Sequence, residues 1–255
     1  MKNYFDLAGR VALVTGASSG LGVQFAKALA NQGADLAICA RRVDRLEAVK
    51  AEIEAMGVKC YVHACDVTKT EDIIATVNDT IAHYGKIDIL VNNAGLGWVA
   101  PATEYEEGNW RTMMDTNVNS VFFFAREVAK HMIPAGYGRI INIGSIHSTV
   151  SMNGNPLAAY ATTKGAVLMM TKTLACEWAK TGVTVNAIGP GYFASEMTQA
   201  GLETPEFQGA MGVYCPMGRC GKEGELDTAL LYFASEYSTY TTGQLIQVDG
   251  GWNTI

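Results

Sequence analysis

Short, continuous runs of apolar residues recur along this chain and alternate with longer segments of helical periodicity. A strand that is apolar on both faces is typical of a parallel sheet, because helices cover it from both sides. The runs predict strands at 11–14, 36–40, 61–63, 87–91, 139–143, 183–188 and 244–248. Strands alternating with helices in this way predict an α/β fold, a doubly wound, seven-stranded parallel sheet flanked by helices.

No linker, repeat or low-complexity stretch divides the 255 residues, so we expect 1–255 to form a single domain. One segment breaks the regular alternation. Residues 192–225 combine glycines and two prolines with methionine and aromatic side chains. A long irregular insertion in a compact domain is usually functional, which predicts a substrate loop here.

Composition excludes several classes of protein. Hydrophobic residues make up 49% and charged residues 17%, a balance unlike that of disordered chains. A net charge of −6 argues against nucleic acid as a partner. No apolar run approaches the length of a membrane span, and residues 1–6 lack the apolar part of a signal peptide. The six cysteines form no C-x-x-C pair and no histidine lies at ligand spacing, so we expect no metal and a cytoplasmic protein.

A glycine-rich turn directly follows the first predicted strand and opens a helical segment. Gly16, Gly20 and Gly22 have the spacing G-x-x-x-G-x-G. Glycines there allow a pyrophosphate to approach backbone N–H groups, and the helix N-terminus favours an anion. The alternative is an ordinary strand-to-helix turn. The predicted contacts of this turn are Gly16, Ser18, Ser19, Gly20, Leu21 and Gly22.

A tyrosine and a lysine at helical spacing are candidates for proton transfer. Tyr160 and Lys164 share one face of a helix expected at about 160–180. A phenol has a pKa of about 10, and a nearby ammonium lowers it toward the range of an efficient acid or base. Ser145 follows the predicted strand 139–143, at the strand end where active-site groups collect.

Four motifs in this order resemble the short-chain dehydrogenase/reductase family. They are T-G-x-x-x-G-x-G at 15–22, N-N-A-G at 92–95, Y-x-x-x-K at 160–164 and P-G at 190–191. The resemblance extends from about residue 7 to residue 251. It implies a Rossmann-type fold and an NAD(P)(H)-dependent oxidoreductase that interconverts a secondary alcohol and a ketone by hydride transfer.

The resemblance also assigns catalytic roles. Tyr160 would be the general acid/base, and Ser145 would donate a hydrogen bond to the substrate oxygen. Lys164 would hold the nicotinamide ribose, and Asn117, in an expected helix at about 110–132, would hold a water of the proton relay. A non-catalytic regulator on the same fold is the alternative of a different class. The complete set of Ser145, Tyr160 and Lys164 argues against it.

The end of the second predicted strand bears on the choice of nicotinamide. Ala40 stands where an acidic residue would select NAD, and Arg41 and Arg42 follow. A guanidinium can bind a 2′-phosphate, so we predict NADP(H), with Arg41 as the main contact. NAD(H) is the alternative, with both arginines in a solvated turn. Ser19 stands where some NADP-binding relatives carry a basic residue, which departs from that pattern.

The resemblance implies further cofactor contacts. Asp66 would bind the adenine amino group, and the carboxamide would meet the turn after Pro190, where Ser195 replaces the threonine common in the family. The predicted cofactor contacts include the glycine-rich turn, both arginines, Tyr160 and Lys164. The remaining predicted cofactor contacts are Asp66, Val67, Asn93, Ala94, Gly95, Pro190, Gly191, Phe193 and Ser195.

The predicted substrate walls are apolar and rich in methionine. Their candidate contacts are Trp98, Ile146, His147, Leu157, Tyr192 and Met197, although His147 could also line the rim. In the insertion only Arg219 and Lys222 are cationic, whereas a sugar acid or a phosphorylated substrate would normally need a cation. We therefore expect a hydroxysteroid or bile-acid-like alcohol or ketone first.

Two alternative substrates remain, because the overall sequence also resembles their enzymes. One is a 3-oxoacyl-[acyl-carrier-protein], for which Arg111, Arg126 and Lys130 are candidate carrier contacts. The other is a polyol or sugar acid, as in gluconate 5-dehydrogenase. The resemblance and the apolar helices expected near 105–132 and 158–180 also predict a homotetramer.

Overall fold

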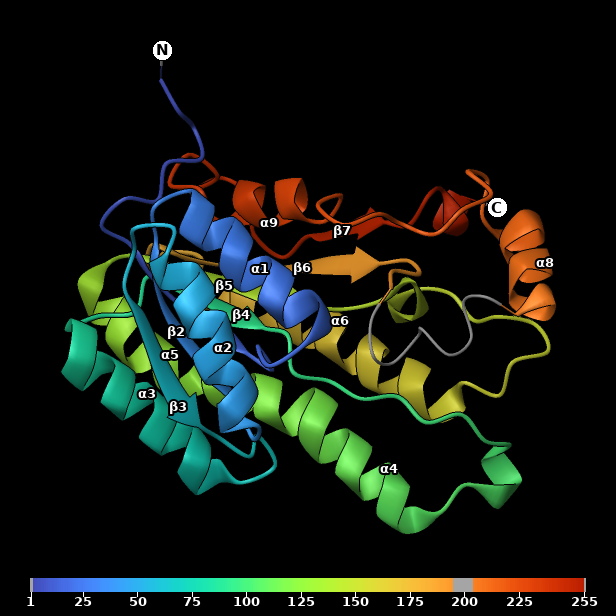
Figure 1. The fold of residues 1–255 in the computed structure, drawn as a ribbon. Coiled ribbons are helices and arrows are strands. Elements are labelled where there is room, and N and C mark those ends of the chain that lie inside the picture. Colours follow the sequence, from blue (N-terminus) through green and yellow to red (C-terminus); the bar gives the residue numbers. More distant parts are fainter. Residues whose placement is uncertain (1, 195–203, 255) are drawn as a thin grey trace.

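The computed structural model describes residues 2–194 and 204–254, in which seven parallel strands form one sheet (Figure 1). The strand order is β3-β2-β1-β4-β5-β6-β7. The strands are β1 Val11–Thr15, β2 Asp35–Ala40, β3 Cys60–Ala64, β4 Ile89–Asn92, β5 Gly138–Ile143, β6 Val183–Pro190 and β7 Leu245–Val248. The order reverses between β1 and β4, which confirms the doubly wound, Rossmann-type prediction. The assignment of 1–255 to a single domain stays a prediction.

Helices cover both faces of this sheet. They are α1 Gly20–Asn31, α2 Val43–Glu54, α3 Thr70–Tyr84, α4 Glu107–Met114, α5 Ser120–Ala135, α6 Ala158–Trp178, α8 Pro205–Tyr214 and α9 Asp227–Ala234. Successive residues of β1 point to opposite faces: Val14 packs with Phe25 of α1, and Leu13 packs with Phe124 of α5. Both faces are buried, which explains why the strand sequences lack polar alternation.

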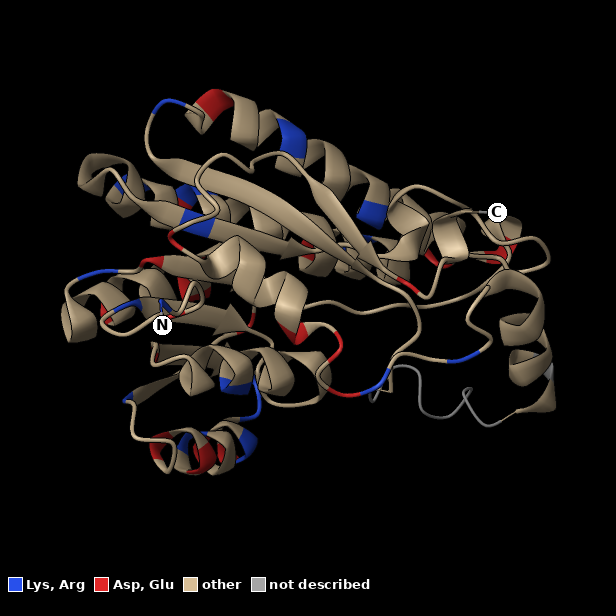
Figure 2. Ribbon diagram, turned by 90° about the horizontal axis from the view of Figure 1, so that it is seen from above, with Lys and Arg blue, Asp and Glu red and all other residues tan. Residues whose placement is uncertain are grey.

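Charged side chains of both signs are spread over the helices and loops that surround the sheet (Figure 2). Within the described residues, no helix is both long and apolar enough to cross a membrane.

The single helix expected at about 110–132 is in fact two helices joined by a wider turn. Helix α4 ends at Met114, residues Asp115–Asn119 form a π-helical turn, and α5 begins at Ser120. A π turn adds a residue to one helical turn and is frequent at functional sites. Here it carries Asn117, which is buried.

The insertion at 192–225 is only partly irregular, which corrects the sequence-based description. Helix α8 lies within it, with Pro205 in the first turn and the Thr204 hydroxyl accepting a hydrogen bond from the N–H of Phe207 at 3.3 Å. The helix lies beyond the carboxyl-terminal end of β6 (Figure 1). Helix α9, which packs beside α1, was not among the predicted helices.

A buried chain of side-chain hydrogen bonds ties α6 to the sheet. Asn92 at the end of β4 donates from Nδ2 to Oδ1 of Asn142 on β5 at 2.9 Å. Asn142 in turn donates from Nδ2 to the hydroxyl of Thr171 on α6 at 2.9 Å. Since α6 also carries Tyr160 and Lys164, this chain sets the position of the catalytic helix relative to β4 and β5.

We expect Thr171→Val to lower the free energy of unfolding by about 1–3 kcal/mol, because the buried Asn142 amide loses its acceptor. Thr173→Val is the matched control. The Thr173 hydroxyl also bonds to a carbonyl four residues earlier, that of Met169 at 3.1 Å, but Thr173 is exposed. Urea unfolding of both variants measures the difference, and equal losses would contradict the role of the buried chain.

Candidate active site

Ser145 stands directly after β5 with its side chain held in place. Its hydroxyl oxygen accepts the N–H of His147 at 3.1 Å and caps the short 3₁₀ turn Ile146–Ser148. The hydroxyl of Ser148 accepts the N–H of Ser145 at 3.1 Å, which completes a capping box. The Ser145 side chain also lies close enough to the Tyr160 hydroxyl to act on its pKa. The structure therefore brings the predicted serine and tyrosine together.

The side chains of Asn117 and Lys164 both lie beside Gly95 in the loop that follows β4. The Asn117 side chain bonds twice to the backbone of Leu96, accepting its N–H at 2.9 Å and donating to its carbonyl at 2.8 Å. Lys164 donates from Nζ to the carbonyl of Ile143 at 2.8 Å. A Cβ built on Gly95 would lie 3.5 Å from Oδ1 of Asn117 and 3.8 Å from Nζ of Lys164. All four predicted catalytic residues therefore gather at the ends of β4 and β5.

The pKa values of the pair on α6 differ from the sequence-based expectation. Burial lowers the pKa of Lys164 to about 8. Burial also raises the pKa of Tyr160 above its ordinary value, although the hydrogen bond with Ser145 acts in the opposite direction. The expectation that Lys164 depresses the tyrosine pKa needs correction. Its Nζ lies 5.7 Å from the tyrosine ring centre and bonds to a carbonyl instead.

The glycine-rich turn packs so closely that side chains cannot replace its glycines. Gly16 has a φ of +66°, and a Cβ on Gly22 would lie 2.3 Å from the carbonyl oxygen of Gly16. Nδ2 of Asn93 donates to the carbonyls of Thr15 and Gly16 at 2.9 and 3.3 Å. The Thr15 hydroxyl accepts the N–H groups of Asn93 and Ala94. Asn93, Ala94 and Gly95 thus lie against the turn, as predicted, and Asn93 braces it.

The N-terminus of α1 suits an anion. Ser19 precedes the helix but makes no side-chain hydrogen bond to the N–H groups of its first turn, and that turn contains no acidic residue. These N–H groups and the helix dipole favour a phosphate. The residues here fit the pyrophosphate of a dinucleotide.

Arg42, rather than Arg41, contacts this turn. Its Nη2 donates to the hydroxyl of Ser18 at 3.1 Å and to that of Ser19 at 2.8 Å. Arg41 is exposed, and its charge acts on Asp66. The expectation that Arg41 is the main contact of a 2′-phosphate stays a prediction, whereas Arg42 is the arginine that bonds to the turn. The guanidinium supplies the positive charge that the sequence pattern lacks at Ser19.

Asp66 and Val67 follow β3, beside the end of β2. Oδ1 of Asp66 accepts the N–H and the hydroxyl of Thr68 at 3.1 and 2.8 Å. Burial acts to raise the pKa of Asp66, but the Thr68 hydrogen bonds and the Arg41 charge outweigh it, so the pKa lies below its ordinary value. Val67 is half-buried and packs against the core. Asp66 is therefore an acceptor at the position expected for the adenine.

The predicted substrate residues divide into packed and accessible ones. Ile146 is buried in a small cluster with Met211, Cys215 and Trp252, and Leu157 is also buried. Tyr192 is half-buried, and its ring centre lies 5.2 Å from that of Trp252. Trp98 is exposed. Ser195 and Met197 lie outside the described residues.

The turn after β6 is tightly built. A Cβ on Gly191 would lie 2.8 Å from Cα of Asp249, which leaves room only for glycine. Pro190 ends β6, and Phe193 is buried against Gly221, to which it is joined by an isolated parallel bridge. These residues sit at the same end of the sheet as Ser145.

Comparison with known proteins identifies the family. Residues 10–206 match the family model of the short chain dehydrogenases. The chain belongs to the short-chain dehydrogenase family. Its resemblance to that family, stated from four motifs, is thus confirmed, and it is an oxidoreductase of the class that acts on CH–OH groups.

Individual relatives cover almost the whole chain. Gluconate 5-dehydrogenase of Gluconobacter oxydans strain 621H is 41% identical over 247 residues, which cover 97% of this chain and 96% of the relative. Galactitol 2-dehydrogenase (L-tagatose-forming) of Cereibacter sphaeroides is 38% identical, with 98% of each chain covered. A solved gluconate 5-dehydrogenase from Burkholderia cenocepacia J2315, in complex with NADP and tartrate, has a TM-score of 0.94 at 36% identity, covering 99% of this chain and 98% of that chain.

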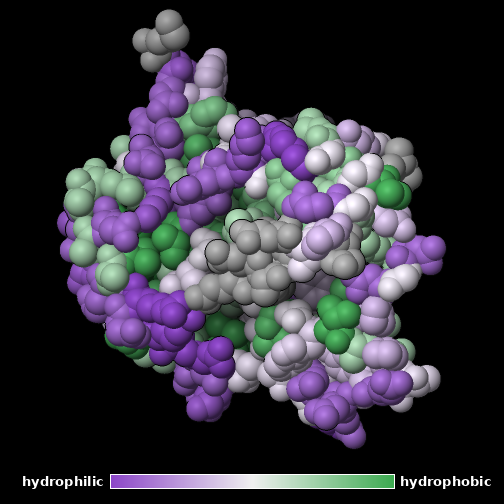
Figure 3. All heavy atoms as spheres, turned by 45° about the vertical axis from the view of Figure 1, so that its right-hand side comes forward, coloured by the Kyte–Doolittle hydropathy of each residue, from purple (hydrophilic) through white to green (hydrophobic). Residues whose placement is uncertain are grey.

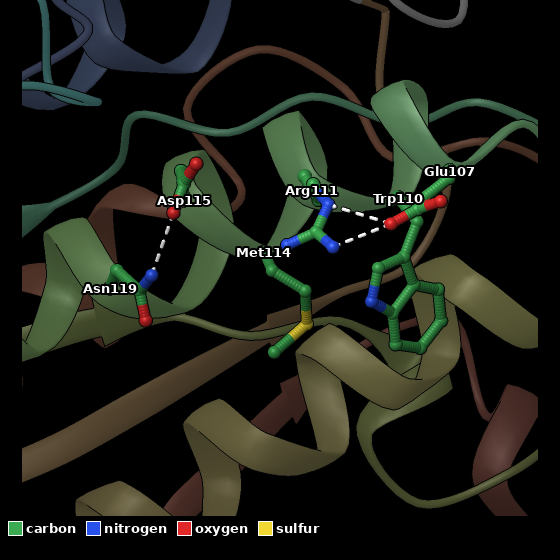
Figure 4. A pocket seen from close by; sticks show the side chains of 6 residues that line it. All are labelled: Glu107, Trp110, Arg111, Met114, Asp115 and Asn119. Atoms are coloured by element: carbon green, nitrogen blue, oxygen red, sulfur yellow. Dashed lines mark hydrogen bonds and ion pairs between the residues drawn. The ribbon is translucent and has the colours of Figure 1, made fainter.

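The dehydrogenase has a surface pocket that contains none of the residues predicted to bind the cofactor or to take part in catalysis, although Arg111 is one of the candidate carrier contacts. A surface pocket of about 510 Å³ lies on α4 and the π turn, lined by Glu107, Trp110, Arg111, Met114, Asp115 and Asn119 (Figure 4). In it, Nε of Arg111 donates to Glu107 at 3.0 Å, and Nδ2 of Asn119 donates to Asp115 at 2.7 Å. Its polar groups bond to one another on one helical surface, away from the serine and tyrosine.

Sequence reasoning missed Trp252 and Phe207, whose rings contact Tyr192 on two sides. Neither belongs to a motif, and Trp252 is three residues from the end of the chain. Only the return of β7 to the edge of the sheet brings it to the substrate end. All six cysteines are free thiols, and in the described part of the chain no cluster of His, Cys, Asp or Glu could hold a metal ion.

Buried Lys164 should reduce the stability of the folded protein at neutral pH. Because its pKa falls to about 8 on folding, the unfolded chain binds more protons between that pH and the lysine's ordinary pKa of 10.5. Stability should therefore rise with pH across this window, and the penalty is complete below pH 8. We expect Lys164→Met to lack turnover but to unfold with about 1–3 kcal/mol more free energy at pH 7.

Urea unfolding at pH 7 and at pH 10 tests this, since the advantage of Lys164→Met should shrink at the higher pH. Lys172→Met, an exposed lysine on the same helix, is the matched control and should show no such change. A Lys164→Met protein that is less stable than the wild type at pH 7 would sink the prediction.

Proposed function

We propose that the protein is an NADP(H)-dependent oxidoreductase that interconverts a secondary alcohol and a ketone on a polyhydroxylated substrate of the sugar-acid or polyol class. One observation carries the reaction type: Ser145 lies close enough to the Tyr160 hydroxyl to act on its pKa, and Nζ of buried Lys164 lies 5.7 Å from the centre of the Tyr160 ring. The alternative of a non-catalytic regulator does not account for this arrangement.

The chain's own residues provide the proton chemistry. Ser145 donates a hydrogen bond to the substrate oxygen, and Tyr160 gives its proton to that oxygen in ketone reduction. The raised pKa of Tyr160 keeps the phenol protonated at neutral pH, which is the form that reduction requires. In the oxidative direction the phenol must first lose that proton. Asn117 and Lys164 hold the loop after β4 and the end of β5 in place around it.

The cofactor-binding residues support NADP(H), with NAD(H) as the alternative. The bound nicotinamide would supply the hydride chemistry. The N–H groups at the start of α1 would hold the pyrophosphate, and Arg42 would bind the 2′-phosphate. Ala40, at the end of β2, carries no carboxylate to repel that phosphate. The solved gluconate 5-dehydrogenase with NADP shares this fold.

The relatives favour sugar acids and polyols over the hydroxysteroid expected first. Gluconate 5-dehydrogenase and galactitol 2-dehydrogenase both act on polyhydroxylated compounds, as their names state. The apolar walls that suggested a steroid are largely used in packing, since Ile146, Met211 and Trp252 bury one another. The gluconate-type alternative therefore becomes the leading substrate class.

The 3-oxoacyl-carrier alternative loses its main support. The three cations proposed to bind an acidic carrier are already paired with glutamates. Arg111 bonds to Glu107, and both Arg126 and Lys130 bond to Glu127 at 2.7 and 2.6 Å. Pairing cancels most of the positive field that would attract a carrier.

The homotetramer and the cytoplasmic location stay predictions. Phe122 on α5 and Met169 on α6 are exposed apolar side chains on the helices expected to pair between subunits.

We expect Tyr160→Phe to lower turnover about 10²- to 10⁴-fold, because the proton donor is removed. Binding of NADPH, followed by its fluorescence, should be unchanged. Tyr232→Phe on α9 is the control, since that hydroxyl bonds to Thr241 outside the site. Retained turnover in Tyr160→Phe would rule out the proposed proton transfer.

We expect Arg42→Ala to raise the KM for NADPH by about 10-fold or more, through loss of charged hydrogen bonds to the 2′-phosphate. The KM for NADH should barely change. Arg41→Ala is the matched control and should have the smaller effect on NADPH. Equal effects of the two substitutions, or an effect on NADH alone, would contradict the assignment.

A further inference from the structure

His147 has a buried ring nitrogen without a partner beside the reacting groups. The side chain is 6% exposed, and within the described residues Nε2 has no hydrogen-bond partner. The other nitrogen, Nδ1, lies 3.2 Å from the carbonyl oxygen of Val150. A carbonyl only accepts, so Nδ1 carries the hydrogen. In the neutral ring Nε2 is then an acceptor.

Burial keeps this ring neutral at physiological pH, because it lowers the pKa of His147 below its ordinary value. The hydrogen bond with the Val150 carbonyl acts the other way but is the smaller effect. Nε2 is therefore an acceptor to which no described residue donates a hydrogen bond. A buried acceptor without a hydrogen bond lowers the free energy of unfolding.

The position of His147 places this acceptor next to the reacting carbon. Its backbone N–H bonds to the hydroxyl oxygen of Ser145, and its ring stands edge-to-face with Tyr160, with 6.3 Å between ring centres. A ketone held by Ser145 and Tyr160 therefore has the carbons next to its carbonyl near the histidine ring. A hydroxyl on such a carbon is a donor of the kind that Nε2 lacks.

Among the described residues of these surroundings, the cations already interact with other groups. Arg219 forms a bidentate pair with Glu225, the charge of exposed Lys222 also lowers the pKa of Glu225, and Lys164 bonds to the Ile143 carbonyl. In the sequence, residues 96–106 and 145–159 contain no lysine or arginine. A buried carboxylate without a cation is strongly disfavoured. The face of the molecule seen in Figure 3 mixes hydrophobic with hydrophilic residues.

We propose that His147 is a specificity-determining residue that accepts a hydrogen bond from the hydroxyl next to the reacting carbon, and that the substrate is an uncharged hydroxyketone or polyol rather than a sugar acid. This inference rests on the proposed alcohol–ketone chemistry and narrows its substrate class.

Two small ketones that differ by one hydroxyl group test the proposed hydrogen bond to His147. Reduction of 3-hydroxy-2-butanone and of 2-butanone by NADPH is followed for the wild type, His147→Phe and His147→Gln. We expect the wild type to favour the hydroxyketone in kcat/KM by at least 10-fold. His147→Phe should lower kcat/KM for the hydroxyketone at least 10-fold more than for 2-butanone, while His147→Gln, which retains an acceptor, should recover part of the preference. Unchanged melting temperature and NADPH binding control for misfolding.

A second pair of substrates, one uncharged and one with a carboxylate, tests the preference for an uncharged substrate. L-tagatose and 5-keto-D-gluconate are compared on the wild-type enzyme, and we expect the uncharged ketose to have the higher kcat/KM. A higher value for the acid overturns the claim of an uncharged substrate. An unchanged hydroxyketone preference in His147→Phe overturns the role of His147. Failure of the wild type on every ketone would instead refute the proposed function, so the two failures are distinguishable.

Discussion

The junction between the ends of β1 and β4 is the constraint on which the site depends. The Thr15 hydroxyl accepts two backbone N–H groups from the loop after β4, and Asn93 donates back to the carbonyls of Thr15 and Gly16. This reciprocal set lies where the strand order reverses, the place at which a doubly wound sheet opens a crevice. A side chain at Gly22 would collide with the Gly16 carbonyl and with the Asn93 side chain. The glycine spacing and Asn93 therefore depend on each other.

From that junction the catalytic groups are positioned by two further devices. The π turn turns Asn117 inward, where it bonds to Leu96 of the same loop. The buried chain from Asn92 through Asn142 to Thr171 then ties α6, and with it Tyr160, to the sheet. The first device links the π turn to the loop after β4, and the second links α6 to β4 and β5. The relative position of Ser145 and Tyr160 therefore depends on polar contacts as much as on the apolar core.

The site itself works against stability. Burial raises the pKa of Tyr160 and lowers that of Lys164, so both groups are favoured in their neutral forms. His147 likewise keeps a buried acceptor without a partner among the described residues. Such features are typical of sites whose polar groups are arranged for a ligand rather than for the fold. The apolar cluster of Ile146, Met211 and Trp252 offsets part of this cost by closing the substrate end.

The sequence by itself determined the α/β class, the seven strands and the family, and it named the four residues proposed as catalytic, because apolar runs and short motifs are local patterns. The tertiary structure decided what depends on contacts between distant segments. It placed the Arg42 guanidinium on Ser18 and Ser19 of the turn, which lie 24 and 23 positions earlier in the chain. It broke the helix expected at 110–132 at Asp115–Asn119, and it brought Trp252 to Tyr192. It also made burial, rather than the charge of Lys164, the main influence on the pKa of Tyr160, because packing sets that balance and spacing along a helix does not reveal it.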